Sequence, residues 1–417
     1  MDVMVVGAGI GGLFTALRLH AEGLRCVIYE RGQQIRELGV GINALPFAVG
    51  ELAALGLLDR LGEIGVHTGE LVYTHRLGQE IMRRPCGLAA GFGYPQISVH
   101  RGRLQGLLHR AVVERLGADA VRAGHRLVGF EQDADAVTAR FADGSQARGD
   151  VLVGADGIHS VVRSTLFPDE GPPLWNGVMM WRGATEWPEY ESGRTMVIAG
   201  GNAAKLVVYP IAAGTTPGTE LTNWAMCVTT GRPGDPPPSE QDWTRAADPA
   251  DMAEHIKLFT SDRFDHAAMI AATRDRFEFP MCDRDPLPWW TRGRVTLLGD
   301  AAHPMYPMGS NGAGQAILDA VNLGAHLAAG ADPADALAAY EHDRLPATTQ
   351  VVRRNRLGGP EQVIDEVERR APDGFTRLAD VIDPTELESI VASYTRLSTG
   401  SPASTDRPGN PPPPATA

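Results

Sequence analysis

The hydrophobic pattern at the start of the chain predicts a strand, a helix and a second strand. Residues 3–6 form an apolar run, and a segment with helical spacing follows at once. One face of that segment carries Leu13, Ala16, Leu17 and His20. Gly23 suits the position just beyond the end of this helix. The next apolar run, 26–29, stops at the acidic residue Glu30, so the pattern predicts a βαβ unit.

The next elements follow from shorter patterns. A Gly-rich loop at 39–43 is expected to precede a helical stretch that runs through Leu57. An amphipathic helix is expected after His100, and a hairpin over 128–141. The first part of the chain is therefore expected to mix helices and strands.

The centre of the chain, about 175–290, changes character. Short β-type runs between turns predict a mostly antiparallel sheet there, as a second domain. A strand pattern returns at 294 and leads into a long Ala-rich helix, so the chain re-enters the first domain. Residues 331–397 are expected to be helical, and the tail 398–417, rich in Pro, Ser and Thr, to be disordered. The first domain is assigned to 1–72, 97–172 and 290–330, and the second to 73–96 and 173–289.

Composition narrows the classes of partner. At 417 residues the chain can bury a full core, and its 38 basic and 51 acidic residues give a formal net charge of −13. This charge repels phosphate backbones and anionic surfaces, so neither nucleic acid nor membrane is expected as a partner. No apolar stretch approaches the roughly 20 residues that span a bilayer. Four cysteines without metal or disulfide spacing are typical of a reducing compartment. No metal is therefore expected, and the predicted location is cytoplasmic.

The turn between the first strand and helix has the glycine spacing of a dinucleotide site. Gly7 permits the tight turn, Gly9 lets the backbone approach a pyrophosphate, and Gly12 lets helix and strand pack closely. The start of the helix offers free N–H groups and a favourable dipole to phosphate. Glu30 can accept hydrogen bonds from a ribose diol. A turn that only connects strand and helix is the alternative.

A second motif follows the buried strand at 151–154. The sequence Gly-Ala-Asp-Gly there includes Asp156 and Gly157, and it exposes a carboxylate at the strand end where α/β ligand sites lie. The alternative is a strand–turn–helix corner in which Asp156 or Ser160 caps the helix. On this motif alone, the capping interpretation is favoured.

A third motif ends the strand at 295–298 with Gly299-Asp300. A long loop rich in Gly and Pro leads from it into a helix whose first residues include Gly312 and Gly314. The N–H groups and dipole at this helix start suit a group that becomes anionic, such as the N1–C2 edge of a reduced flavin. Capping and turn chemistry is again the alternative.

These three motifs, in this order, resemble the fingerprint of single-component flavin-dependent aromatic hydroxylases, the para-hydroxybenzoate hydroxylase-like family. Four further stretches, 38–43, 180–183, 283–288 and 306–313, resemble its 5-methylphenazine-1-carboxylate 1-monooxygenase branch. The resemblance implies a Rossmann-like α/β FAD-binding domain interleaved with a mostly antiparallel β-sheet substrate domain, followed by C-terminal helices. It also implies FAD as a tightly but non-covalently bound cofactor.

The resemblance implies which residues hold FAD. In this sequence they are Gly7, Gly9, Gly12, Leu13, Glu30, Arg31, Gly41, Arg101, Gln105, Asp156, Gly157, Asp300, Gly312 and Ala313. Arg101 would face the phosphate and ribitol region, and Asp300 would bond the ribityl chain. Asp156 and Gly157 would serve FAD and the transient nicotinamide donor together. The chain departs from the family at Gly314, where most members carry Asn, so side-chain contacts cannot be assumed at this position.

In the implied reaction, NADH or NADPH reduces FAD, and O2 then forms a flavin C4a-hydroperoxide that hydroxylates an electron-rich ring. The implied substrate is a phenazine carboxylate or an amino- or hydroxybenzoate of secondary metabolism, with hydroxylation or oxidative decarboxylation as outcomes. Tyr209 and Tyr306 are candidates for substrate contact, with plain packing as the alternative for both. Arg182 is a candidate partner for a ring carboxylate, with a solvated arginine as the alternative.

Several alternatives stay open at this point. His303 is expected to order its loop and not to act as a base. The alternative function is an FAD-dependent oxidoreductase or a halogenase-related enzyme without hydroxylase activity, although the halogenase signature W-x-W-x-I-P is absent. The sequence does not distinguish NADH from NADPH, nor a monomer from a homodimer.

Overall fold

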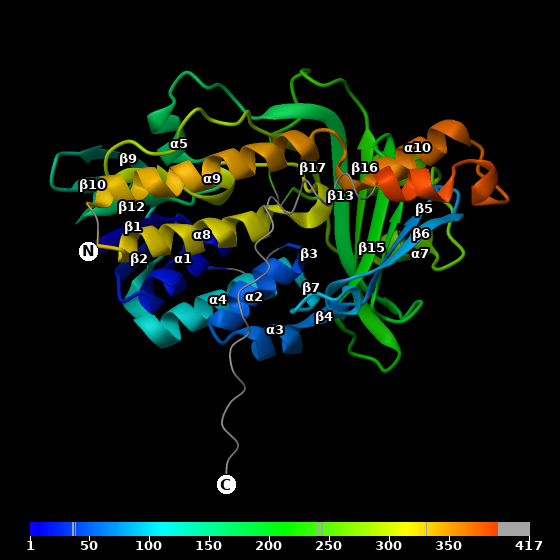
Figure 1. The fold of residues 1–417 in the computed structure, drawn as a ribbon, viewed down its shortest axis with the longest axis horizontal. Coiled ribbons are helices and arrows are strands. Elements are labelled where there is room, and N and C mark those ends of the chain that lie inside the picture. The colour runs from blue at the N-terminus through cyan, green and yellow to red at the C-terminus, as the bar shows by residue number, and fades with distance from the viewer. Residues whose placement is uncertain (36, 38, 241, 243–244, 331, 391–417) are drawn as a thin grey trace, which may run out of the picture.

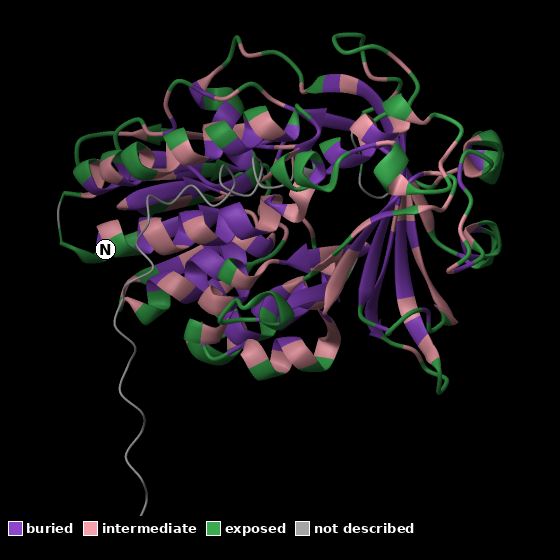
Figure 2. Ribbon diagram, turned by 45° about the vertical axis from the view of Figure 1, so that its right-hand side comes forward, coloured by how far each residue is buried: buried purple, intermediate pink, exposed green. Residues whose placement is uncertain are grey.

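The computed structural model of the protein describes residues 1–390 apart from 36, 38, 241, 243, 244 and 331. The tail predicted to be disordered, 398–417, lies outside the described residues. Two large sheets lie side by side, with helices packed around them (Figure 1). The strands of both sheets are largely buried, and exposed residues concentrate in the connections (Figure 2).

The first sheet is the predicted βαβ unit extended to five parallel strands. In spatial order these are β18 (Val295–Leu297), β12 (Val151–Gly154), β1 (Asp2–Val6), β2 (Arg25–Tyr29) and β8 (Val121–Arg122). The central strand places Val5 opposite Val153 on one side and Ile28 on the other. Parallel strands of this kind are buried on both faces, which explains their continuous apolar runs.

Helices and a small sheet pack around this five-stranded sheet. Helix α1 (Ile10–Ala21) packs against α4 (Arg101–Leu116) and α8 (Gly312–Ala328), and α9 (Pro333–Asn355) packs on α8 (Figure 1). Gly23, with a φ of 77°, ends α1 as predicted. The predicted hairpin is formed by β9 (Leu127–Gln132) and β10 (Val137–Phe141), which β11 (Gln146–Gly149) extends to three strands.

The second large sheet has seven strands. Their order is β17 (Arg276–Asp283), β13 (Leu174–Pro188), β16 (Thr219–Thr229), β15 (Ala204–Ala213), β14 (Thr195–Ala199), β5 (Glu70–Thr74) and β6 (Glu80–Pro85). All neighbours are antiparallel except β14 and β5. The predicted fold class, a Rossmann-like part with a mostly antiparallel sheet and C-terminal helices, is confirmed.

The segment 39–57 differs from its prediction. Gly41–Ala44 is a strand, β3, and it pairs with β7 (Gln96–His100), which also pairs with β4 (Gly65–Thr68). The helix that follows, α2 (Pro46–Ala54), ends before Leu57, and a second helix, α3 (Leu58–Ile64), begins after it. The break coincides with Gly56, whose φ of 67° is incompatible with a continuous helix.

The two faces of the seven-stranded sheet have different neighbours. One face packs against α6 (Pro249–Ile256) and α7 (His266–Ala272) and carries Leu206, Val208, Trp224 and Met226. We call the other the inner face. It carries Met180, Cys227 and Phe279, which pack against Tyr306 and Met308 of the loop before α8. Helix α10 (Gln362–Arg370) covers another part of this face, where Val363 and Ile364 pack on Tyr209 and Ile211.

Across the residues that the structure describes, no helix combines the length and the apolar character that crossing a membrane requires.

Candidate active site

The turn after β1 packs tightly against the rest of the protein at Gly7 and Gly12, and it is open at Gly9, which lies between them. A Cβ on Gly12 would lie 2.0 Å from the carbonyl oxygen of Gly7, and a Cβ on Gly7 would lie 2.4 Å from that of Ala155. Gly7 also has a φ of 106°, which favours glycine. At Gly9, no described heavy atom outside the adjoining residues lies within 4 Å of such a Cβ. The open side of the turn is therefore at the N-terminus of α1, as a phosphate site requires.

Two side chains from other elements bond to this turn. Glu30, directly after β2, accepts hydrogen bonds from the N–H groups of Ala8 at 2.8 Å and Gly32 at 2.7 Å. Gln105, on α4, donates from Nε2 to the carbonyl oxygen of Ala8 at 2.7 Å. Arg31 follows Glu30 and is exposed. The structure thus brings Glu30 and Gln105 together on the glycine turn, and the Glu30 oxygens keep lone pairs for further donors.

The carboxylate of Asp156 caps the helix that follows it, α5 (Val161–Leu166). It accepts hydrogen bonds from the Val161 N–H at 2.7 Å and from the Ser160 hydroxyl, whose oxygen accepts the Arg163 N–H at 2.9 Å. Burial raises the pKa of Asp156. The capping alternative therefore describes this side chain. Gly157 has a φ of 81° and open space at its Cα, so the backbone of the turn is accessible.

Asp319, inside α8, holds the Gly299-Asp300 turn in place. Its carboxylate accepts the Gly299 N–H at 3.0 Å, lies 2.5 Å from His303 Nε2, and accepts from Arg344 Nε at 2.8 Å. Burial acts to raise the pKa of Asp319, but the neighbouring His303 and Arg344 lower this pKa to about 2. His303 thus orders the loop. Asp319 was not predicted from the sequence. The signal that could have found it is an acidic residue beside the apolar stripe of its helix.

Asp300 and Arg101 lie close enough for the charge of each to act on the pKa of the other. Asp300 has exposed surface, yet burial raises its pKa, while His303 and Arg101 act in the opposite direction. Burial likewise lowers the pKa of Arg101, against the charge of Asp300. The end of β18 and the start of α4 therefore bring two opposite charges near each other.

The N-terminus of α8 is open on one side and covered by an aromatic ring on the other. A Cβ on Gly312 would meet open space, and Ala313 beside it is half-buried. Gly314 is buried, and a Cβ there would lie 2.7 Å from Cε2 and Cζ of Phe47. Phe47, in the first turn of α2, is 38% exposed. Its ring therefore occupies the space into which a side chain at Gly314 would extend.

Arg182 and Tyr209 both lie on the inner face of the large sheet. Arg182 donates from Nη2 to the carbonyl oxygen of Gly41 at 2.9 Å, and the Gly41 N–H donates to Asn223 Oδ1 at 2.7 Å. Burial lowers the pKa of Arg182 to about 10 and raises that of Tyr209 to about 12. Arg182 is half-buried, and its hydrogen bond to Gly41 ties the guanidinium to β3.

Tyr306 is fixed by a buried network. Its hydroxyl donates to the carboxylate of Asp283, which also accepts from Arg356 Nε at 2.6 Å. Burial, with the charge of Asp283, raises the pKa of Tyr306 well above its usual range. The ring packs with Phe279 and Met308. The packing alternative therefore describes Tyr306, because its polar end is already paired.

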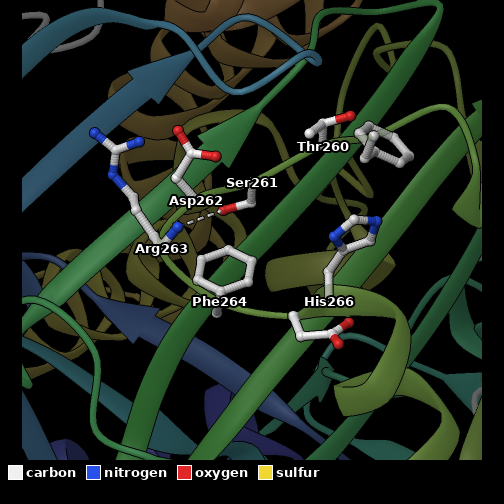
Figure 3. Close-up of a pocket in the computed structure, with 8 residues that line it drawn as sticks. Thr260, Ser261, Asp262, Arg263, Phe264 and His266 are labelled. Atoms are coloured by element: carbon white, nitrogen blue, oxygen red, sulfur yellow. Dashed lines mark hydrogen bonds between the residues drawn. The ribbon is translucent and has the colours of Figure 1, made fainter.

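A surface hollow of about 400 Å³ lies elsewhere, along residues 259–266 (Figure 3). Its lining includes Arg263, whose N–H donates to Ser261 Oγ at 3.2 Å and whose guanidinium pairs with Glu80 and Glu191. The hollow belongs to the connection between α6 and α7, on the face of the sheet opposite the inner one. Its lining residues include neither Asp300 nor Arg101.

Comparison with known proteins identifies the family. A model described as an FAD binding domain matches residues 1–355. The phenazine 1,6-dicarboxylic acid hydroxylase of Lysobacter antibioticus is 44% identical over 370 residues, which cover 85% of this chain and 89% of that protein. The chain belongs to the FAD-dependent aromatic hydroxylases.

Further relatives agree with this assignment. This hydroxylase is 34% identical to 3-hydroxybenzoate 6-hydroxylase 1 of Aquipseudomonas alcaligenes, over 85% of its own length and 88% of the relative's. Among solved structures, HpxO of Klebsiella pneumoniae, in complex with FAD and uric acid, is 27% identical with a TM-score of 0.71. That match covers 96% of this chain and 93% of HpxO.

The residues of the three turns fit the FAD that this family binds. Open backbone at Gly9, Gly157 and Gly312 faces away from close protein contacts, whereas Gly7 and Gly12 are tightly packed. This is the pattern of a cradle in which the ligand approaches backbone N–H groups directly. Three separate stretches thus leave backbone N–H groups or a carboxylate open, which is compatible with one elongated cofactor.

Proposed function

We propose that this enzyme hydroxylates a flat aromatic carboxylic acid of the phenazine carboxylate or amino- or hydroxybenzoate type, using O2 and NADH or NADPH. The names of the relatives support the substrate class, since they act on a phenazine dicarboxylic acid, 3-hydroxybenzoate and 3-amino-4-hydroxybenzoate. The observation that carries the proposal is Arg182, a half-buried cation on the inner sheet face, bonded to the first residue of β3.

The proposed FAD site follows the predicted residues except for Leu13 and for the Asp156 side chain, which caps α5. Leu13 is removed, because its side chain is fully buried in the core and its N–H donates to the Gly9 carbonyl oxygen at 3.0 Å within α1. The glycine turn and Glu30 would hold the adenosine diphosphate half, supported by Gln105. Arg101 and Asp300 would hold the middle of the cofactor, and the start of α8 its flavin ring.

Bound FAD supplies the transfer of reducing equivalents from the nicotinamide donor and the activation of O2. The chain contributes position, electrostatics and the exclusion of water. Arg182 orients an anionic ring by pairing with its carboxylate. The apolar inner face, with Met180 and Phe279, keeps water from the ring. Tyr209 contributes a neutral hydroxyl, because burial keeps its proton in place near neutral pH.

We propose the cytoplasm as the location, where nicotinamide donors are supplied. All residues of the proposed site come from one chain, so either a monomer or a homodimer is compatible with it.

A panel of aromatic acids tests the proposal. The purified holoenzyme is mixed with NADH or with NADPH, with and without each acid, and the products are analysed by mass. We expect at least one phenazine carboxylate or substituted benzoate to stimulate consumption of the nicotinamide and to gain one oxygen atom. Consumption at the basal rate with every acid, or stimulation that yields only hydrogen peroxide, would favour an FAD-dependent oxidoreductase without hydroxylase activity.

A further inference from the structure

A second cation, Lys205, lies on the inner face of the sheet, on β15. Lys205 is opposite Cys227 on β16, and Cys227 is opposite Met180 on β13. In the next row, Val207, Ala225 and Arg182 are opposite one another in the same way. Directly opposed residues share a face, and so do residues two apart on one strand. Lys205 therefore points to the same side as Arg182.

The ammonium of Lys205 is buried but poorly satisfied. The residue is only 3% exposed. Among the described residues, the recorded partners of Nζ are the Met308 sulfur at 3.0 Å and Glu361 Oε1 at 3.7 Å. An ammonium has three strong donors, whereas a thioether is a weak acceptor, and 3.7 Å is too long for a hydrogen bond.

Glu361 does not complete the pair. It is 4% exposed, and its second carboxylate oxygen, Oε2, has no hydrogen-bond partner among the described residues. Burying two charges is costly unless the geometry is close and the remaining donors and acceptors are satisfied. A structural pair would therefore be expected to be shorter and better bonded. The arrangement leaves Lys205 with capacity for another anion.

The side chain over Lys205 is suited to being displaced. Met308 lies in a short 3-10 turn, Met308–Ser310, directly before α8. Ser310 has a φ of 57°, which is uncommon outside glycine and marks a strained position. Met side chains are flexible and adapt to irregular spaces. Movement of the Met308 side chain would expose Nζ on the inner face, beside the apolar cluster of Met180, Cys227 and Phe279.

We propose that Lys205 is a specificity-determining residue that binds a carboxylate of the aromatic substrate, taking the place of the Met308 sulfur as its partner. This inference rests on the proposed function and names a second contact for the same substrate. The Cα atoms of Lys205 and Arg182 are separated by two strand spacings and two residues along the strand, about 12 Å. This separation is of the order of the length of a fused aromatic ring system, so the two cations can bind carboxylates at different ends of one substrate.

The test compares an acid with its neutral analogue in matched variants. Wild type, Lys205→Met, Lys205→Arg and Glu361→Gln are prepared as holoenzymes, and their FAD content and melting temperature are recorded. Equilibrium binding of phenazine-1-carboxylate and phenazine-1-carboxamide is measured by calorimetry, and KM and kcat by stimulated NAD(P)H consumption. Met has nearly the length of Lys without its charge, so the variant removes the ammonium and little else.

We expect Lys205→Met to weaken binding of the acid by about 30-fold or more, because a buried charge pair is broken. Binding of the carboxamide should change by less than about threefold, so the preference for the acid is lost. Lys205→Arg should restore most of that preference. Glu361→Gln removes the competing anion, and the preference should be kept or increased.

A purely structural role predicts something different. Lys205→Met and Glu361→Gln would then weaken acid and carboxamide alike, with lower melting temperatures, and that result overturns the inference. An unchanged acid-to-carboxamide ratio in Lys205→Met also overturns it. Wild type that binds the acid through Lys205 without hydroxylating it would overturn the proposed function only. Wild type that binds neither compound counts against both.

Discussion

Arg163, on α5, donates hydrogen bonds from Nη1 to the carbonyl oxygens of Ala302 at 2.8 Å and Ala301 at 3.0 Å. Its side chain is buried, and its Nε donates to Glu170 Oε2 at 2.7 Å. The helix capped by Asp156 is therefore bonded directly to the turn that contains Asp300. Two of the three motifs, separated by more than a hundred residues, are held together by one guanidinium.

Replacing Arg163 by Met should destabilise the protein by about 3–5 kcal/mol, since carbonyl groups and a carboxylate lose a buried charged partner. The Asp300 turn should also loosen, so FAD affinity should fall. Denaturant unfolding and FAD titration measure the two effects. Arg284→Met is the matched control, because Arg284 also pairs with Glu170 but bonds to Ile158 and not to the Asp300 turn. Equal loss of FAD in both variants would contradict the role of Arg163.

Gly9 and Gly12 should respond differently to alanine. A Cβ at Gly12 overlaps the Gly7 carbonyl oxygen, so Gly12→Ala should lower the melting temperature even without FAD. Gly9 has a φ of −72° and open space, so Gly9→Ala should leave the apoprotein unchanged and weaken FAD binding by about tenfold or more. Thermal unfolding of apoprotein and FAD titration separate the two. Normal FAD affinity in Gly9→Ala would count against a pyrophosphate at this turn.

Asp300→Asn should stabilise the apoprotein while weakening its binding of FAD. Burial raises the pKa of Asp300, so its contribution to stability is greatest below the unfolded pKa and is lost as pH rises through the folded one. The variant should therefore melt at a higher temperature than wild type at pH 7, and the difference should vanish at acid pH. Melting curves of apoprotein across pH, with FAD titrations, test this. A lower melting temperature at pH 7 would contradict it.

Gly314 and Phe47 should be coupled. An Asn at Gly314 would overlap the Phe47 ring, so Gly314→Asn should cost about 1–3 kcal/mol of stability. Phe47→Ala removes the ring, and the double variant should recover most of that loss. Unfolding of the four proteins forms a double-mutant cycle. Additive effects would show that the ring does not occupy this space in solution.

Tyr209→Phe should leave the shape of the pH–rate profile unchanged between about pH 6 and pH 9. Burial raises the pKa of Tyr209 to about 12, despite the opposing charge of Arg182, so the phenol is protonated throughout this range. The rate itself should fall only modestly if the hydroxyl orients the ring. Loss of an ionisation from the profile of kcat/KM would instead identify Tyr209 as a titrating group.

The sequence by itself determined the βαβ start, the central antiparallel sheet and the three turns of the proposed cofactor site. Each of these is local. Glycines such as Gly7 report the backbone conformation that a turn needs, and runs of alternating or continuous apolar residues report burial. The strand at Gly41–Ala44 was not predicted, because it depends on a long-range contact. It forms by pairing with β7, and the local Gly-rich sequence carries no signal of that pairing.

Only the tertiary structure decided which side chains meet. The capping role of Asp156, the pairing of Tyr306 with Asp283 and the contact of Phe47 with Gly314 all depend on packing between distant segments. The same holds for Lys205. In the sequence it is one lysine within an apolar strand, and only the pairing of β15, β16 and β13 shows that it shares a face with Arg182. Periodicity assigns a residue to a face of its own strand, whereas the partner on that face is chosen by the fold as a whole.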